Sequence, residues 1–167
     1  KYPVIVHTSV IYNPDKIGKG SIIYPGTIIM NNCTIGDFTL INSGVTFGHD
    51  VNVGNFCNIN SGVNLAGRIT IEDGSFLGIG ATVRENIKIG KNCIIRAGSI
   101  LYEGSTFGDY FQTGCSVSIR ERNAFGKGSM FGTMCQSECD VIVGDYSRII
   151  NGVEVGKNAK IGKYVWI

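Results

Sequence analysis

An apolar residue recurs at every sixth position along almost the whole chain. Counting in sixes from Ile5 to Ile167 gives 28 positions, and 26 of them carry an aliphatic or aromatic side chain. The two exceptions are Thr113 and Ser137. The apolar face of an α-helix recurs every three to four residues, so a strict period of six does not fit a helix. This period restricts the chain to an architecture built from six-residue units.

A second position in each unit is small or β-branched. It lies two residues before the large apolar residue, as Cys33 does before Ile35 and Val45 before Phe47. Residues two apart point to the same side of an extended strand, so both should face the inside of the fold. A polar or glycine pair follows each large residue and is typical of a turn at a corner.

Three units make a longer period of eighteen residues. The pair Ile17-Gly18 recurs as Ile35-Gly36 and continues in steps of eighteen, with one glutamate in place of glycine. Three short strands and three corners in each coil predict an all-β protein, a hexapeptide-repeat parallel β-helix. We expect a single domain over residues 1–167, with about nine coils and no insertion loop, roughly 40 Å tall.

Charge and hydropathy exclude several classes of partner. The 15 lysines and arginines nearly balance 13 acidic residues, giving a net charge of +2, and they form no basic run. This distribution disfavours binding to nucleic acid or to an anionic membrane. No apolar stretch approaches the ~20 residues of a membrane span, and the N-terminal residues lack the apolar core of a secretion signal. We expect a soluble, cytoplasmic protein.

The six cysteines indicate neither disulfides nor a metal site. Four of them occupy the small inward position, where they fill the core: Cys33, Cys57, Cys93 and Cys135. Cys115 and Cys139 fall at corners, and no Cys-x-x-Cys or Cys–His spacing indicates zinc. A zinc carbonic anhydrase of the β-helix type needs three histidines, and this chain has two. We therefore expect no metal.

His49 and Asp50 form a titratable pair in a stretch that is otherwise small and aliphatic, INSGVTFGHDVNVGNFCNINSGVNLAG. His49 follows the core residue Phe47 by two positions, so it should lie at a corner rather than point inward. Gly67 lies eighteen residues later, directly one coil above, and has no side chain to cover its backbone N–H. The pair is either a base beside a hydrogen-bond donor or a solvated corner histidine.

Residues 1 to about 104 resemble the β-helix domain of hexapeptide-repeat acetyltransferases that act on sialic acid or on UDP-linked amino sugars of bacterial surface glycans. The motifs are VIVHTSVI, IGKGSIIYPGTIIMNNCTIGDFTLINSGVTFGHDVNVGNF, NLAGRITIEDGSFLGIGATV and IKIGKNCIIRAGSI. The resemblance implies a left-handed coil, acetyl-CoA as co-substrate, and a homotrimer with active sites in the clefts between neighbouring prisms. The acetyl thioester is already activated, so no metal is needed.

The resemblance also implies roles for the residues around the His-Asp pair. His49 would be the general base that deprotonates the acceptor's amine or hydroxyl, since an imidazole pKa of ~6.5 suits that task near neutral pH. Asp50 would orient the imidazole and favour its protonated form during transfer. The backbone N–H of Gly67 would stabilise the developing oxyanion.

Other matched positions would contact the two substrates. Asn42 matches a residue that contacts the acceptor, although stacked asparagines also stabilise turns of β-solenoids. Asn58 stands where several amino-sugar N-acetyltransferases have a second histidine that contacts the acceptor, so the acceptor stays open. Gly78, Ile79 and Ala97 fall in segments that resemble those lining the pantetheine arm of CoA.

Residues 105–167 continue the repeat but resemble other hexapeptide sugar acyltransferases, through GDYFQTGCSVSIRERNAFGKGSMFGT. Cys115 stands where those proteins have the histidine of an FQTGH element, and a thiol is a poor base for activating oxygen. We therefore expect no second active site. Arg120 and Arg122 could contact a phosphate of CoA or of a nucleotide sugar, or could belong to a solvated face.

The two ends of the chain carry a further expectation. The resembling enzymes usually have an N-terminal nucleotide-sugar-binding domain of Rossmann type, whereas this sequence starts at the β-helix. It ends at KYVWI in mid-coil, so we expect the natural protein to continue beyond residue 167.

The leading hypothesis is an acetyl-CoA-dependent acetyltransferase that acts on an amino sugar, a nucleotide-linked amino sugar or sialic acid in surface glycan biosynthesis. The alternative is a non-catalytic β-helix that serves as a scaffold or a glycan-binding module. The sequence leaves N- versus O-acetylation open.

Overall fold

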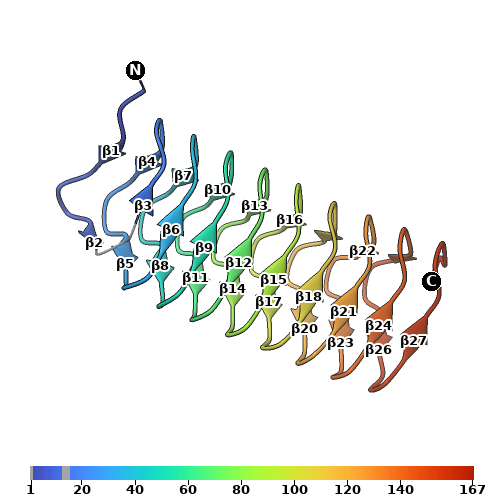
Figure 1. Cartoon of the computed structure of the whole chain (residues 1–167). Helices are drawn as coiled ribbons and strands as arrows, with labels where there is room; N and C mark the ends of the chain where they lie inside the picture. The colour runs from blue at the N-terminus through green and yellow to red at the C-terminus, as the bar shows by residue number, and fades with distance from the viewer. Residues whose placement is uncertain (1, 13–15) are drawn as a thin grey trace.

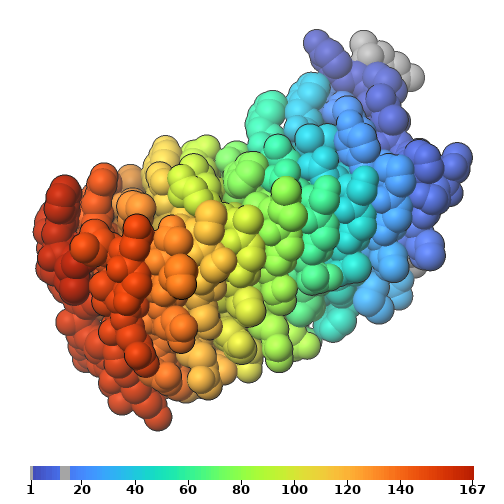
Figure 2. All heavy atoms as spheres, turned by 180° about the vertical axis from the view of Figure 1, so that it is seen from behind, coloured from blue at the N-terminus to red at the C-terminus, as the bar shows by residue number. Residues whose placement is uncertain are grey.

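The computed structural model describes residues 2–12 and 16–167, and these fold as a β-helix. They form 27 strands of two residues each, arranged in three parallel nine-stranded sheets, and no helix. Figure 1 shows the coils stacked along one axis with the two termini at opposite ends. The space-filling view shows a continuous elongated body (Figure 2). The predicted fold, an all-β left-handed parallel β-helix of about nine coils, is confirmed.

Each sheet is one face of a three-sided prism. The first face consists of β1 (Ile5–Val6), β4 (Ile22–Ile23), β7 (Leu40–Ile41), β10 (Asn58–Ile59), β13 (Phe76–Leu77), β16 (Ile94–Ile95), β19 (Gln112–Thr113), β22 (Met130–Phe131) and β25 (Arg148–Ile149). The second face consists of β2 (Ile11–Tyr12), β5 (Ile28–Ile29), β8 (Thr46–Phe47), β11 (Asn64–Leu65), β14 (Thr82–Val83), β17 (Ile100–Leu101), β20 (Ser118–Ile119), β23 (Gln136–Ser137) and β26 (Glu154–Val155). The third face consists of β3 (Lys16–Ile17), β6 (Thr34–Ile35), β9 (Asn52–Val53), β12 (Thr70–Ile71), β15 (Lys88–Ile89), β18 (Thr106–Phe107), β21 (Ala124–Phe125), β24 (Ile142–Val143) and β27 (Lys160–Ile161).

The faces meet at three corners, which we name by the faces they join. The chain turns from the first face to the second at corner 1–2 and from the second to the third at corner 2–3. It returns to the first face of the next coil at corner 3–1. From β3 onward each strand pairs with the strand eighteen residues later, as Ile59 does with Leu77. Equivalent corner residues of successive coils therefore stack in columns.

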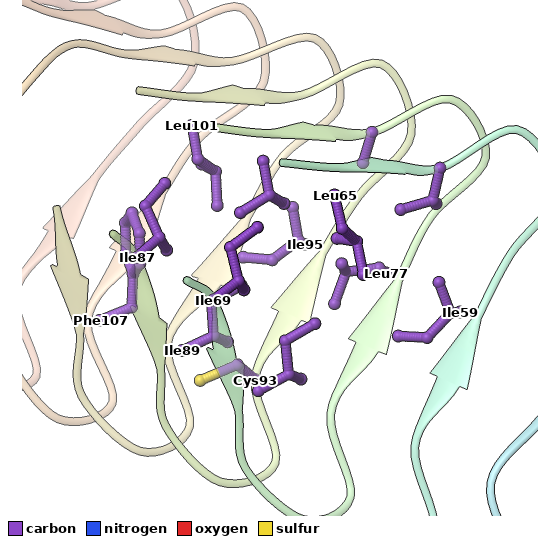
Figure 3. Packing of buried hydrophobic residues seen from close by; sticks show 14 of the residues in the cluster. Ile59, Leu65, Ile69, Leu77, Ile87, Ile89, Cys93, Ile95, Leu101 and Phe107 are labelled. Atoms are coloured by element: carbon purple, nitrogen blue, oxygen red, sulfur yellow. The ribbon is translucent and has the colours of Figure 1, made fainter. Parts of the chain in front are cut away.

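The core is the inside of the prism, filled by the second residue of each strand. Figure 3 shows Ile59, Leu65 and Leu77 pointing into this interior from neighbouring strands. The smaller inward position is also filled as predicted, since Cys33 and Val45 are fully buried. Burying each large aliphatic side chain contributes about 1.5–3 kcal/mol, so a column of them holds the coils together.

The first coil departs from the predicted column. Ile5 and Ile11 were expected inside, but they are 54% and 69% exposed. The structure pairs Val6 with Ile23, a spacing of seventeen residues, so Val6 faces the core in place of Ile5. The reason is that the unit before Ile17 is one residue shorter than the others. Successive strand residues point to opposite faces, so a shift of one residue exchanges the core-facing and solvent-facing positions of the preceding strands.

The two polar exceptions in the column are buried and hydrogen-bonded. The Thr113 hydroxyl accepts a bond from the Arg96 N–H at 2.8 Å. The Ser137 hydroxyl accepts one from Asn123 Nδ2 at 2.6 Å, and Asn123 Oδ1 in turn accepts one from the Val141 N–H at 2.7 Å. Pairing of this kind removes the cost of burying polar groups.

The remaining cysteine positions also follow the repeat. Cys57, Cys93 and Cys135 are buried, Cys115 is exposed, and no disulfide forms among the described residues. Within the described ranges, no group of three or more His, Cys, Asp or Glu residues could hold a metal ion. The same ranges contain no helix long and apolar enough to cross a membrane.

Candidate functional site

The His49-Asp50 pair lies at corner 2–3, directly after β8. The two side chains are hydrogen-bonded, with His49 Nδ1 2.6 Å from Asp50 Oδ2. Asp50 has a left-handed backbone with φ 59°, a conformation that Asp adopts more readily than most residues. Asn32, one coil below, donates from Nδ2 to Asp50 Oδ1 at 3.0 Å. The carboxylate is therefore fixed between the imidazole and the amide.

These contacts set the charge state of the carboxylate. The hydrogen bond to His49, followed by that from Asn32, holds the pKa of Asp50 below its ordinary value. An ionised carboxylate accepts a hydrogen bond from the protonated Nδ1. In the neutral imidazole the proton is then on Nδ1, and Nε2 keeps a free lone pair. Both side chains are 44% exposed, so Nε2 is accessible to a ligand.

Nε2 of His49 lies against the backbone of Gly67, as the eighteen-residue spacing predicted. A Cβ atom built on Gly67 would lie 2.7 Å from this nitrogen, closer than real Cβ contacts come. The φ angle of Gly67 is not in the left-handed region, so the imidazole and not the backbone conformation requires glycine here. The Gly67 N–H finds no hydrogen-bond acceptor among the described residues. A base and a free donor therefore lie side by side.

The predicted acceptor residues lie away from the corner of His49, and one of them, Asn58, begins β10 in the first face. Asn42 is at corner 1–2, where its Nδ2 donates to Asn58 Oδ1 at 3.2 Å and to the Ile59 carbonyl at 3.3 Å. One coil above, Asn60 Nδ2 donates to the Leu77 carbonyl at 2.9 Å. Asn42 and Asn60 thus tie successive coils together, which is the turn-stabilising alternative for stacked asparagines.

The predicted CoA-lining residues share corner 1–2. A Cβ on Gly78 would lie 2.5 Å from the Ala97 nitrogen, so this glycine lets two coils approach closely. Ile79 projects outward and is 64% exposed, and Ala97 is also exposed. The structure therefore separates the predicted site residues into two groups, with His49 and Gly67 at corner 2–3 and the substrate residues at corner 1–2 or, for Asn58, in the first face.

A column of large side chains above Ala66, the residue before Gly67, was only partly recognised from the sequence. Arg84, Tyr102 and Arg120 occupy equivalent positions in three successive coils. The Arg84 Cζ lies 5.6 Å from the centre of the Tyr102 ring, and the Arg120 Cζ lies 5.8 Å from it. Sequence reasoning singled out Arg120 but missed Arg84 and Tyr102, although their eighteen-residue spacing was visible.

A surface hollow of about 390 Å³ adjoins this column. The lining residues are Ala66, Arg84, Glu85, Asn86 and Glu103. Ala66 is the chain neighbour of Gly67, so the hollow begins in the coil of Gly67 and extends over the next two coils. Another hollow, of about 260 Å³, lies on the third face and contains none of the predicted site residues.

Comparison with protein families supports the repeat. Residues 68–102 match the family described as "Bacterial transferase hexapeptide (six repeats)". None of the curated protein sequences is significantly similar to this chain.

Several solved structures share the fold. They include a UDP-N-acetylglucosamine acyltransferase from Francisella novicida (TM-score 0.72, 16% identity, covering 90% of this chain and 62% of that one). The UDP-N-acetylglucosamine O-acyltransferase LpxA from Moraxella catarrhalis gives a TM-score of 0.67 at 16% identity, with coverages of 87% and 62%. The acetyltransferase domain of PglB from Neisseria gonorrhoeae gives 0.54 at 24% identity, with coverages of 71% and 49%.

The chain thus spans less than two thirds of each of these three structures. At such identities the likeness establishes the fold, since one fold hosts many activities. The hexapeptide repeat and the β-helix implied by the resemblance are confirmed.

Proposed function

We propose that this chain, a hexapeptide-repeat β-helix with the fold of sugar acyltransferases, is itself such an enzyme. It transfers an acetyl group from acetyl-CoA to an amino sugar, a nucleotide-linked amino sugar or sialic acid, in the cytoplasmic biosynthesis of a surface glycan. The observation that carries the proposal is the contact between His49 Nε2 and Gly67, with Nδ1 held by Asp50. A solvated corner histidine would not require a glycine above it.

The geometry supports a direct transfer. His49 Nε2 accepts the proton from the acceptor's amine or hydroxyl while the nitrogen or oxygen attacks the thioester carbonyl carbon. The new C–N or C–O bond gives a tetrahedral intermediate, and the Gly67 N–H donates a hydrogen bond to its oxyanion. The C–S bond then breaks, and the departing CoA thiolate takes the proton from the imidazolium. Asp50 stabilises that imidazolium, and general base catalysis of this kind contributes about 10²–10⁴-fold.

A homotrimer would complete the site. Corner 1–2 of a neighbouring prism would bring Asn42, Asn58 and the segments around Gly78, Ile79 and Ala97 toward the His49 of the first. The outward residues of the first face favour association, because most are apolar: Ile22, Leu40, Phe76, Ile94 and Met130. An apolar surface of this kind is commonly covered by a partner, and closed cyclic symmetry is the usual arrangement of identical chains.

Release of the CoA thiol from acetyl-CoA tests the proposal, with a panel of UDP-amino sugars and sialic acids as acceptors. His49→Ala should lower turnover by about 10²–10⁴-fold without changing the circular dichroism spectrum. The matched control is His7→Ala, which removes the other histidine, an exposed residue hydrogen-bonded to Ser9, and should leave turnover unchanged. Equal turnover of His49→Ala and the unaltered protein would contradict the mechanism.

The alternative function is a scaffold or a glycan-binding module without catalysis. Calorimetry separates the two, because the enzyme must bind acetyl-CoA and a scaffold need not. Absence of acetyl-CoA binding together with absence of turnover would favour the scaffold.

A further inference from the structure

Arg84 carries a guanidinium without a counterion. Across residues 2–12 and 16–167, no carboxylate lies within ion-pair distance of it, and its side chain makes no hydrogen bond. Other arginines at the same corner are paired, Arg68 with Glu85 at 2.5 Å and Arg122 with Asp140 at 2.7 Å. An unpaired guanidinium offers five N–H donors in a fixed fork that matches phosphate oxygens.

The Tyr102 ring restricts where this guanidinium can lie. Arg84 comes from the coil below Tyr102 and Arg120 from the coil above, and each Cζ is within 6 Å of the ring centre. Such cation–π contacts contribute about 0.5–1 kcal/mol at exposed sites. Arg120 is also bonded to Glu121 at 3.2 Å, which leaves Arg84 as the free cation of the column. The ring therefore positions a donor group before any ligand binds.

The hollow beside Arg84 connects it to the catalytic corner. It begins at Ala66, next to Gly67, and Arg84 is two coils above the coil of His49, about 10 Å along the prism at ~4.8 Å per rung. Glu103 lines the same hollow and, in the described part of the chain, forms no ion pair. The wall thus presents a free guanidinium and a free carboxylate, which suit a ligand with both a phosphate and a hydroxyl group.

We propose that Arg84, positioned by Tyr102, binds a phosphate group of a substrate whose reacting end lies at His49, while Glu103 accepts a hydrogen bond from a neighbouring hydroxyl. This inference rests on the proposed function and adds a subsite to it. Both substrates of that reaction contain such chemistry, since a nucleotide-linked sugar carries a diphosphate and CoA carries phosphates beyond its pantetheine arm. The subsite is defined by the phosphate, and the experiment separates the two sources.

Calorimetry with the full chain tests the subsite by measuring the affinity for UDP, CoA and pantetheine. Pantetheine lacks phosphate and serves as the control ligand. Arg84→Gln should weaken binding of the phosphate ligand by about tenfold or more, because hydrogen bonds between charged groups are lost. Binding of pantetheine should not change. A loss for UDP alone assigns the subsite to the nucleotide sugar, and a loss for CoA alone assigns it to the acyl donor.

Arg148→Gln is the matched control. Arg148 also lies over an aromatic ring, with its Cζ 5.5 Å from the centre of Trp166, and forms no ion pair among the described residues. This variant makes the same charge change far from His49 and should bind every ligand normally. Tyr102→Phe keeps the ring and should keep the affinity, whereas Tyr102→Leu should lose part of it.

Two results would overturn the subsite: unchanged affinity of Arg84→Gln for UDP and CoA, or failure of the unaltered protein to bind either. These results are independent of catalysis, because His49→Ala should still bind the phosphate ligand. If the chain binds phosphate through Arg84 yet acetylates no sugar, the subsite stands and the proposed reaction fails. If it acetylates a sugar and Arg84→Gln binds normally, the reaction stands and the subsite fails.

Discussion

The His49 imidazole occupies the space that a side chain at position 67 would need. Gly67→Ala would place a methyl carbon 2.7 Å from Nε2, and the ring, which is hydrogen-bonded to Asp50, would move aside. We expect turnover to fall about 100-fold, since a shift of about 1 Å in a catalytic group can cost that much. The free energy of unfolding should change little, because the displaced group is the exposed end of a side chain.

Gly156→Ala is the control for that substitution. Gly156 has neither a left-handed φ nor any atom within 4 Å of an added Cβ, so the variant should keep both turnover and stability. Turnover assays with the acceptor identified from the panel, together with urea unfolding, measure both quantities. Full activity of Gly67→Ala would mean that the imidazole does not need its present position.

The buried thiol of Cys93 predicts how stability depends on pH. Burial raises the pKa of Cys93 to about 11, against an ordinary value of 9.0. Below pH 9 the thiol is protonated in both states; between pH 9 and 11 the unfolded chain loses the proton and the folded chain keeps it. The free energy of unfolding should therefore fall by on the order of 2 kcal/mol over this range. Cys93→Ala should show a correspondingly smaller fall in the free energy of unfolding. If urea unfolding gave the same pH dependence for the variant and the unaltered protein, this prediction would be wrong.

The site residues show how far the sequence could predict the arrangement. The contact of His49 with Gly67 followed from the eighteen-residue spacing, because equivalent positions of a regular coil must stack. The separation of Asn42 from His49 was not recognised, although Asn42 follows the first strand of its coil and His49 the second. The sequence also could not predict that Arg84 lacks a counterion, since the formation of an ion pair depends on where the side chains lie in the folded protein.

At the scale of the strand, the first coil allows a comparison of two isoleucines, one that faces solvent and one that faces the core, in their contribution to the free energy of unfolding. Ile11 and Ile29 belong to the same sequence column, yet Ile11 is 69% exposed and Ile29 is 2% exposed. Ile29→Ala should lower the free energy of unfolding by about 2–5 kcal/mol because it leaves a cavity. Ile11→Ala should change it by less than about 0.5 kcal/mol. Urea unfolding of both variants measures the difference, and equal losses would mean that Ile11 is buried in solution.

The same coil shows why the fold could be predicted almost completely and its N-terminal register could not. From Ile17 onward each unit has six residues, and the inward pair determines which side of the strand is buried. Before Ile17 the residues on both sides of β1 are apolar, so Ile5 and Val6 fit the core pattern equally well. A period-two pattern cannot choose a face when both faces are apolar. Only the pairing of Val6 with Ile23 settles it.

At the scale of the whole molecule, the separation of the two residue groups means that the proposed reaction depends on the proposed assembly. Within one prism, His49 lies at corner 2–3 and Ala97 at corner 1–2, and the rigid stack of parallel strands prevents the corners from approaching each other. In the proposed trimer, a substrate that contacts both groups would lie between two chains.

Mixed trimers test this arrangement. His49→Ala and Ala97→Trp, which fills the proposed pantetheine path, should each be inactive alone. After the two chains are refolded together in equal amounts, half of the subunits supply an intact corner 2–3 and half an intact corner 1–2. About a quarter of the clefts should then have both corners intact, so thiol release should recover to about a quarter of normal turnover. Mixing His49→Ala with Asp50→Ala should restore nothing, because both changes lie at the same corner. An inactive first mixture would place both groups of one site on a single chain.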